Sequence, residues 1–284
     1  MGFMASKRQI LSTAAFCLGF ALVAGSLVNA AEGRWLEDRL TGIRVWSSEP
    51  KADTAISWSG GELDGQASGL GVLSVFETGR LLARYTGTMR SGRAEGGGEA
   101  YWLKDSERYS FIGPFSGGEP HGSGTVTFPD GSTFTTSFVN GEIGSSGVYQ
   151  GSNGERYEGE LKNGLPEGKG LHVSEHGEIY EGEFHAGKRS GEGELLLPDG
   201  TVMKGQFEND EPNGLVRVDL TDGGVFVGQV VDGAANGDGV YTSPDGVVYR
   251  GPFNQDEPNG SFEVTKPDGT QSTEVWKMGE KTIW

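Results

Sequence analysis

The chain has 284 residues, of which 50 are glycine, and only 35% are hydrophobic. Globular proteins contain ~7% glycine on average, so this composition argues against an α/β enzyme with a thick buried core. The formal charge of −17 excludes a nucleic-acid-binding protein, because neutralising phosphates requires clustered Lys and Arg. Aromatic residues make up 10% of the chain, which argues against disorder, so we expect the glycines to occupy fixed places in a fold.

The N-terminus has the layout of a secretory signal peptide. Lys7 and Arg8 precede an apolar run over residues 10–27, and the small residues Ala30 and Ala31 mark a cleavage site. We expect residues 1–30 to be removed on export, leaving a periplasmic or extracellular protein. The alternative is an uncleaved membrane anchor, which the shortness of the run disfavours.

The single cysteine, Cys17, lies inside the predicted signal peptide and follows Phe16 rather than a small residue, so no lipoprotein anchor is expected. The mature chain would then contain no thiol and no disulfide, and its stability must come from packing and backbone pairing. Residues 31–55, with Trp35, Ile43 and Trp46, are interpreted as an N-terminal cap.

A repeat of 23 residues runs through the rest of the chain, which we assign to residues 56–284. An aromatic or apolar residue begins each unit, a glycine follows two residues later, and a second apolar residue follows two residues after that. Steps of 23 residues lead from Phe111 to Ser272, where the pattern decays, and steps of 26 and 27 residues lead back from Phe111 to Tyr85 and Trp58. About ten units therefore start at Trp58, Tyr85, Phe111, Phe134, Tyr157, Tyr180, Met203, Phe226, Tyr249 and Ser272.

Each unit is predicted to be a β-hairpin. Residues at i, i+2 and i+4 share one face of a strand, and the residues between them are mostly polar, as Glu181 and Glu183 are around Gly182. This alternation is typical of an antiparallel sheet with one wet face. Pro-Asp-Gly at 198–200 and its equivalents supply tight turns. Glycine between two apolar residues leaves a gap into which a ring from an adjacent strand can lie.

These residues resemble the MORN repeat family, and the unit Tyr180-Glu-Gly-Glu-Phe184, Gly187, Gly191-Glu-Gly193, Asp199-Gly200 is similar to its consensus. The resemblance implies an all-β fold, an elongated single-layer twisted antiparallel sheet of about ten hairpins. With the predicted signal peptide, we expect an exported bacterial protein. Departures from the pattern are Thr136 and Glu274 at the strand glycine, Asp210 and Asp256 at the first loop glycine, and Val216 and Phe262 at the last loop glycine.

No catalytic, metal or cofactor site is expected. Nucleophile and phosphate-binding motifs are absent from the sequence. His172 and His176 are the best metal pair, but four residues along a strand separate them by ~13 Å, too far to share one ion. Some MORN proteins carry a kinase or methyltransferase domain, but here the repeats use up the chain. The sequence therefore predicts a non-enzyme.

Surface recognition remains, and the first hypothesis is a protein-binding scaffold in the bacterial envelope or periplasm. Its candidate surface is an aromatic stripe, for which the alternative interpretation is the core of the sheet. The stripe comprises Phe111, Phe115, Phe134, Phe138, Tyr157, Tyr180, Phe184, Phe207, Phe226, Tyr249 and Phe253.

The alternative functions are binding to an anionic membrane surface or to a cell-wall glycan. Residues 31–108 carry 10 Lys and Arg against 12 Asp and Glu, whereas residues 109–284 carry 11 against 28, so charge disfavours membrane contact for most of the chain. A candidate basic patch consists of Arg80, Arg84, Arg90, Arg93 and Arg108, with Lys104 nearby. An open terminal strand further predicts a possible homodimer through sheet edges.

Overall fold

The computed structural model describes residues 33–48 and 52–282. No helix occurs in these two ranges, so they include none that could cross a membrane. The predicted signal peptide, with Ala30 and Ala31, lies outside the described residues. The chain divides into two compact units: Met1–Asn153 with Glu160–Leu165, and Gly154–Gly159 with Pro166–Trp284.

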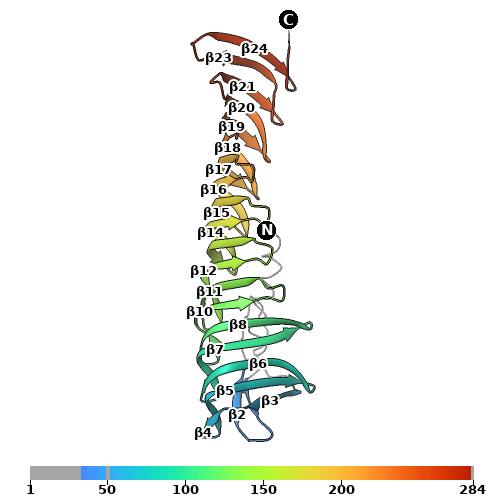
Figure 1. Ribbon diagram of the computed structural model, residues 1–284, viewed down its shortest axis with the longest axis vertical. Helices are drawn as coiled ribbons and strands as arrows, with labels where there is room; N and C mark the ends of the chain where they lie inside the picture. Colours follow the sequence, from blue (N-terminus) through green and yellow to red (C-terminus); the bar gives the residue numbers. More distant parts are fainter. Residues whose placement is uncertain (1–32, 49–51, 283–284) are drawn as a thin grey trace. The chain divides into compact units, whose positions relative to one another are not determined.

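The first unit is built from strands that pair with their neighbours in the chain (Figure 1). One pairing is parallel, between β2 and β5 at Arg44 and Gln66, and it departs from the purely antiparallel prediction because the first hairpin of the chain lies alongside β5. The strands are β1 (Arg34–Glu37), β2 (Arg44–Ser47), β3 (Thr54–Trp58), β4 (Gly61–Leu63), β5 (Gln66–Glu77), β6 (Arg80–Arg90), β7 (Arg93–Lys104), β8 (Glu107–Ser116), β9 (Glu119–Pro120), β10 (Gly122–Thr127), β11 (Thr133–Val139) and β12 (Glu142–Gln150).

The second unit repeats the same antiparallel pairing of successive strands. Two strands at its start, β13 (Arg156–Lys162) and β14 (Leu165–Val173), contribute residues to both units. The others are β15 (Ile179–His185), β16 (Lys188–Leu196), β17 (Val202–Glu208), β18 (Glu211–Asp219), β19 (Val225–Val231), β20 (Ala234–Thr242), β21 (Val248–Asn254), β22 (Glu257–Pro258), β23 (Gly260–Thr265), β24 (Gln271–Lys277) and β25 (Glu280–Lys281).

The prediction of repeated hairpins is confirmed. All ten predicted unit starts, from Trp58 in β3 to Ser272 in β24, lie in strands. The Pro-Asp-Gly segments fall in the turns between hairpins, where Gly200 N–H donates to Leu197 O at 2.9 Å. The 23-residue period therefore corresponds to one pair of strands and its two turns.

Glycine residues lie directly beneath the rings of the repeats, as Gly182 and Gly193 lie beneath Tyr180, and we call such a pair the ring floor. A Cβ added to Gly193 would lie 2.4 Å from Tyr180 Oη and 2.5 Å from Tyr180 Cε2, and one added to Gly182 would lie 2.6 Å from the same Oη. The prediction was a ring from an adjacent strand over Gly182, but the ring is that of Tyr180, two residues away on the same strand. Gly193, predicted to be a loop glycine, lies in β16 and pairs with Gly182. Tyr180 thus covers a cross-strand pair of glycines, and the pair leaves no room for a side chain. Tyr85, Phe111 and Phe226 cover equivalent pairs in their own repeats.

The other two loop glycines of the repeat have separate backbone roles. Ala186 and Gly187 form the two-residue turn between β15 and β16, and both have positive φ (49° and 85°), as a type I′ hairpin turn requires. Gly191, with a φ of 63°, lies where the pairing shifts register, since Gly182 opposes Gly193 but Glu183 opposes Ser190. This β-bulge bends the strand and increases its twist.

Most of the departures from the repeat have local compensations in the structure. Thr136 donates through Oγ1 to a carbonyl of β12 at 2.6 Å. Asp210 and Asp256 accept a backbone N–H from the preceding hairpin through Oδ1, at 2.9 and 2.7 Å. The Phe262 ring lies over Gly251, where an added Cβ would approach it to 2.6 Å. These replacements explain how the array continues through irregular units.

The predicted N-terminal cap contains the β1–β2 hairpin. The rings of Trp35 and Trp46, which pair across it, meet edge to face at 5.5 Å. Asp38 is buried and its carboxylate accepts N–H groups from Leu40 and from Trp58 of β3, both at 2.9 Å. Hydrogen bonds as well as packing therefore hold this segment on the first unit.

Candidate functional site

Most of the predicted aromatic stripe is core. Eight of its eleven side chains are buried, each no more than 4% exposed, and they meet their neighbours edge to face, as Tyr180 meets Phe207 at 5.0 Å. A ring buried in this way stabilises the sheet but cannot contact a partner. The buried members are Phe111, Phe115, Phe134, Phe138, Tyr157, Tyr180, Phe184 and Phe207.

The three remaining stripe residues, Phe226, Tyr249 and Phe253, are only half-buried. Phe226 and Phe253 meet edge to face at 5.1 Å, and Tyr249 stacks on Tyr241 at 6.1 Å. All three lie in the second unit, on β19 and β21. Exposed aromatic surface on the ring face is therefore concentrated near the C-terminal repeats.

An apolar groove of about 580 Å³ opens at this place in the second unit. Its volume falls within the ~300–1,000 Å³ range of typical ligand sites, and apolar side chains dominate its lining. We call it the apolar groove. It is lined by Leu197, Thr201, Met203, Pro212, Val216, Val218, Leu220, Phe226, Val230, Gly233, Ala235, Tyr241, Phe253, Asp256 and Pro258.

The apolar groove follows from two substitutions in one repeat. Met203 stands where the preceding repeats have an aromatic residue, and Val216 stands where they have the second of the two glycines beneath the ring. The nearest atoms to a Cβ added at Gly205 are backbone atoms of Leu215 and Val216, so no ring covers this glycine. The face that Tyr180 closes in its own repeat consequently stays open here.

Most of the groove was missed by sequence reasoning, although a signal for it exists. The stripe prediction named Phe226 and Phe253 but none of the aliphatic residues around them. Val216 was recognised as a departure from the repeat. Its coincidence with the non-aromatic Met203 in the same unit is the pattern that marks an opening in the ring face.

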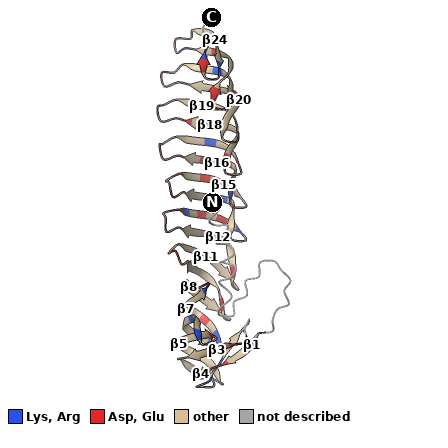
Figure 2. Ribbon diagram, turned by 90° about the vertical axis from the view of Figure 1, so that its right-hand side faces the viewer, with Lys and Arg blue, Asp and Glu red and all other residues tan. Residues whose placement is uncertain are grey.

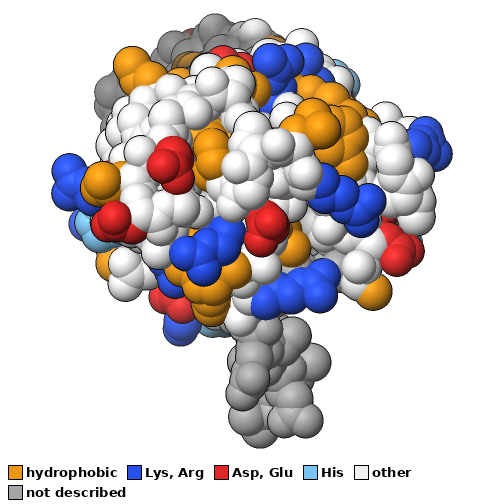
Figure 3. Space-filling model, turned by 90° about the horizontal axis from the view of Figure 1, so that it is seen from below, with side chains coloured by type: hydrophobic (Ala, Val, Ile, Leu, Met, Phe, Trp, Pro, Cys, Tyr) orange, Lys and Arg blue, Asp and Glu red, His pale blue; other side chains and the backbone are white. Residues whose placement is uncertain are grey.

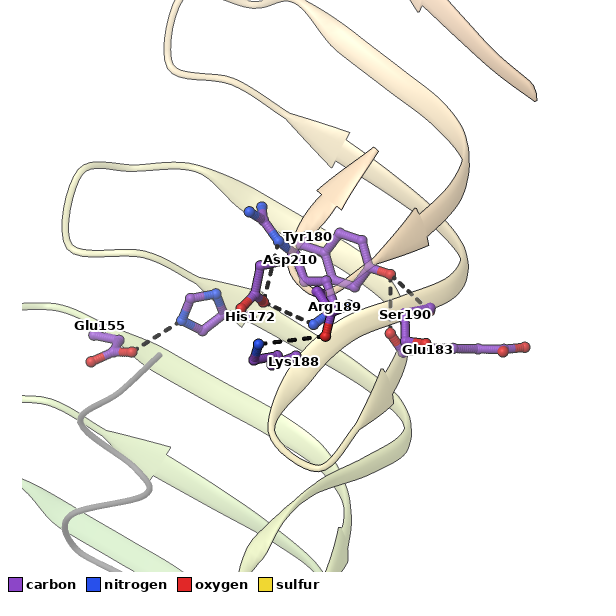
Figure 4. A network of polar contacts seen from close by, with 9 residues as sticks. Glu155, His172, Tyr180, Glu183, Lys188, Arg189, Ser190 and Asp210 are labelled. Carbon is purple, nitrogen blue, oxygen red and sulfur yellow. Dashed lines mark hydrogen bonds and ion pairs between the residues drawn. The ribbon is translucent and has the colours of Figure 1, made fainter. Parts of the chain in front are cut away.

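A polar network next to the groove ties hairpins of the second unit together (Figure 4). Tyr180 Oη donates to the carbonyl of Glu183 at 3.0 Å, and the Arg189 guanidinium lies 5.6 Å from the Tyr180 ring centroid. Burial raises the pKa of Tyr180 to about 12, so this hydroxyl is neutral and acts as a donor. Asp210 of the next hairpin binds the backbone N–H of Arg189. The network positions loops and contains no paired nucleophile and base.

The candidate metal pair is not brought together. His172 Nε2 lies 3.1 Å from Glu155 Oε1 in a poorly exposed contact, whereas the His176 side chain is 79% exposed. Over residues 33–48 and 52–282, no group of three or more His, Cys, Asp or Glu side chains has an arrangement that could hold a metal ion.

The predicted basic patch is divided along β6. Arg80 and Arg90 stand at the two ends of this 11-residue strand, which separates them by roughly 33 Å. Arg93 lies over the Trp46 ring at 4.7 Å and Arg108 over the Tyr101 ring at 4.3 Å, while Arg84 is exposed on the face opposite Tyr85. In Figure 3, Lys and Arg side chains are spread among apolar and acidic ones. Arg84 pairs across the strands with Tyr101, the ring that Arg108 covers, and Arg90 pairs with Arg93 at the other end of the hairpin. The five arginines are therefore divided between separate places along β6 and do not form one patch.

Comparison with known proteins identifies the repeat. The MORN repeat matches residues 111–133, 137–156, 157–174, 180–202 and 226–248. No match was found among curated proteins. Among solved structures, the chain is similar to the SAS-4 (dCPAP) TCP domain of Drosophila melanogaster, in complex with a proline-rich motif of Ana2 (dSTIL), at 15% identity and a TM-score of 0.38.

That similarity covers 54% of this chain and 84% of the Drosophila domain, and at this score it carries no inference about partners. Four of the five matches begin at a predicted unit start, at residues 111, 157, 180 and 226, whereas the match 137–156 begins three residues after Phe134. This chain is a MORN repeat protein.

Proposed function

We propose that the chain is a non-catalytic, exported scaffold that binds another protein through the apolar groove. MORN repeats often serve as protein- or membrane-binding modules, and the predicted signal peptide over residues 1–30 supports export to the periplasm or beyond. The observation that carries the proposal is the groove itself, because contiguous apolar surface on a soluble repeat array marks an interaction site.

Protein is favoured over an anionic membrane as the partner. Residues 109–284 carry a net charge of −17, which repels anionic headgroups, and the arginines of residues 80–108 are divided between separate places along β6. Figure 2 shows acidic positions distributed along the strands and turns. Glycan binding draws no specific support from the arrangement of side chains.

The test compares two leucines close together in the chain. Leu220 lines the apolar groove and is 37% exposed, whereas Leu215 of β18 is 58% exposed and lies outside it. Cross-linking and mass spectrometry on intact cell envelopes would be run with the wild type, Leu220→Asp and Leu215→Asp. We expect Leu220→Asp alone to lose the reproducible cross-linked partners. An identical set of cross-linked proteins for all three chains, or no reproducible set for the wild type, would refute a groove-mediated scaffold.

A further inference from the structure

The apolar groove lies between two rows of acidic turns. Its lining residues reach both ends of the strands, since Leu197 and Thr201 flank one turn and Gly233 belongs to a turn at the opposite end. The first row carries Asp199, Asp222 and Asp245, and the second row carries Asp210, Asp232 and Asp256. The strands between the rows are seven to nine residues long, so the rows are roughly 20–30 Å apart.

The charge around the groove is strongly negative. Residues 197–258 contain eleven Asp and Glu against three Lys and Arg, a net charge of −8. Two of the three cations have acidic neighbours, since Lys204 Nζ lies 3.0 Å from Glu194 and Arg217 pairs with Asp219. Little local positive charge therefore offsets the two rows of turn aspartates.

Backbone hydrogen bonds hold several of these carboxylates in place. Asp222 Oδ1 accepts the Gly224 N–H at 2.8 Å, and Asp256 Oδ1 accepts the Ala235 N–H at 2.7 Å. Tyr241 of the groove is close enough to two of the aspartates to be affected by their charge: burial is the main cause that raises its pKa, and Asp222, Tyr249 and Asp245 raise it further.

Two other occupants are disfavoured by this charge. A second copy of the chain carries a formal charge of −17 and would be repelled. A fatty acid or anionic lipid would fill an apolar groove but would bring a negative headgroup to one of the acidic rows. A peptide segment with both apolar and positively charged side chains fits this site. Its apolar side chains would enter the apolar groove, and its positive charges would face the two rows of turn aspartates.

We propose that the apolar groove binds a short cationic segment of another protein, in which aliphatic or aromatic side chains enter the groove and Lys or Arg side chains reach the two rows of turn aspartates. This inference rests on the proposed function and specifies its partner. The apolar groove would supply most of the affinity, and the two rows of aspartates would add specificity and a faster association rate.

The test uses synthetic peptides of about eight residues, long enough to span the strands. A Leu/Lys peptide, a Leu/Glu peptide and a Ser/Lys peptide would be titrated by fluorescence anisotropy against the whole chain. Asp199→Asn, Asp222→Asn and Asp245→Asn would be combined in one variant, because asparagine keeps the side-chain acceptor of these turns and removes the charge. Asp130→Asn, at the equivalent turn of the first unit, is the matched control.

We expect the Leu/Lys peptide to bind tightest to the wild type. The triple variant should bind this peptide about tenfold more weakly at low salt, because each of the three exposed charges contributes up to a few fold in affinity. Asp130→Asn should retain wild-type binding, and Leu220→Asp should abolish it. Equal binding of the Leu/Lys and Leu/Glu peptides, still sensitive to Leu220→Asp, would overturn the cationic partner while leaving the groove as a protein site. Binding to phosphatidylglycerol vesicles with no peptide binding would overturn both proposals.

Discussion

Adjacent glycines of β7 provide a direct test of the ring floor. A Cβ added to Gly98 would lie 2.6 Å from Tyr85 Cε2 and 2.9 Å from Tyr85 Oη, whereas one added to Gly97 meets nothing within 4 Å. Neither glycine has a positive φ, so the two alanine variants differ in space rather than in backbone strain. Gly98→Ala must displace a tyrosine that is 1% exposed.

Overpacking of this kind costs about 1–3 kcal/mol in the free energy of unfolding. Gly97→Ala should be neutral or stabilising by up to ~1 kcal/mol, because alanine restricts the unfolded chain. Urea unfolding followed by circular dichroism would measure both variants. In a Tyr85→Ala background the penalty of Gly98→Ala should nearly vanish, since the obstructing ring is gone. Equal destabilisation by the two alanines, or an unchanged penalty without the ring, would refute the reasoning.

Three further predictions concern polar groups. Burial raises the pKa values of Tyr85 and Tyr180 to about 12, above the ordinary 10. Each tyrosine should therefore make its full contribution to the free energy of unfolding below pH 10 and lose up to ~2.7 kcal/mol of it as the pH rises through 12. Alkaline urea titrations would show it, and phenylalanine at both positions should flatten the profile. Asp256→Ala removes the acceptor for the Ala235 N–H of the preceding hairpin and should lower the free energy of unfolding by about 1–2 kcal/mol. Asp256→Asn keeps an acceptor and should lower it little. Equal losses for the two variants in thermal unfolding would contradict this role. Asp38→Ala should cost about 1–3 kcal/mol by leaving the Trp58 N–H without its acceptor. Burial alone would raise the pKa of Asp38, but the N–H donors outweigh it and lower the pKa. The difference in free energy of unfolding between the wild type and Asp38→Ala should therefore be present above pH 4 and shrink as the pH falls further. A difference that does not change with pH would argue against a role of the carboxylate.

The hairpin register could be predicted from the sequence because it depends on local periodicity. Residues such as Tyr180, Gly182 and Phe184 share one strand face by geometry alone, and the 23-residue period fixes where the next strand pair begins. The ring floor was also foreseeable in outline, since a glycine between two apolar positions leaves space. Its detail was not, because the partner of Gly182 is a ring of its own strand.

The turns, the bulge and the groove depend on contacts between strands. The sequence places Gly187 and Gly191 in a loop, but only the pairing shows that one closes a type I′ turn and the other sits in a bulge. The stripe was predicted from residue type, while exposure depends on what covers each ring. Phe226 is half-buried because Met203 and Val216 change the packing of the adjacent repeat. These two residues are distant from Phe226 in the sequence, so the residues around Phe226 do not predict its exposure.

The central claim is that the ring face of the second unit is closed at the repeats of Tyr157 and Tyr180 and open at the apolar groove, where we propose that a partner binds. Hydroxyl-radical footprinting with mass spectrometry measures this directly, residue by residue, on the free chain. The structure predicts that Phe226, Tyr241 and Phe253 are oxidised several-fold faster than the buried Phe184 and Phe207. Equal oxidation rates across the five rings would contradict the account, because no distinct opening would then exist for a partner to enter.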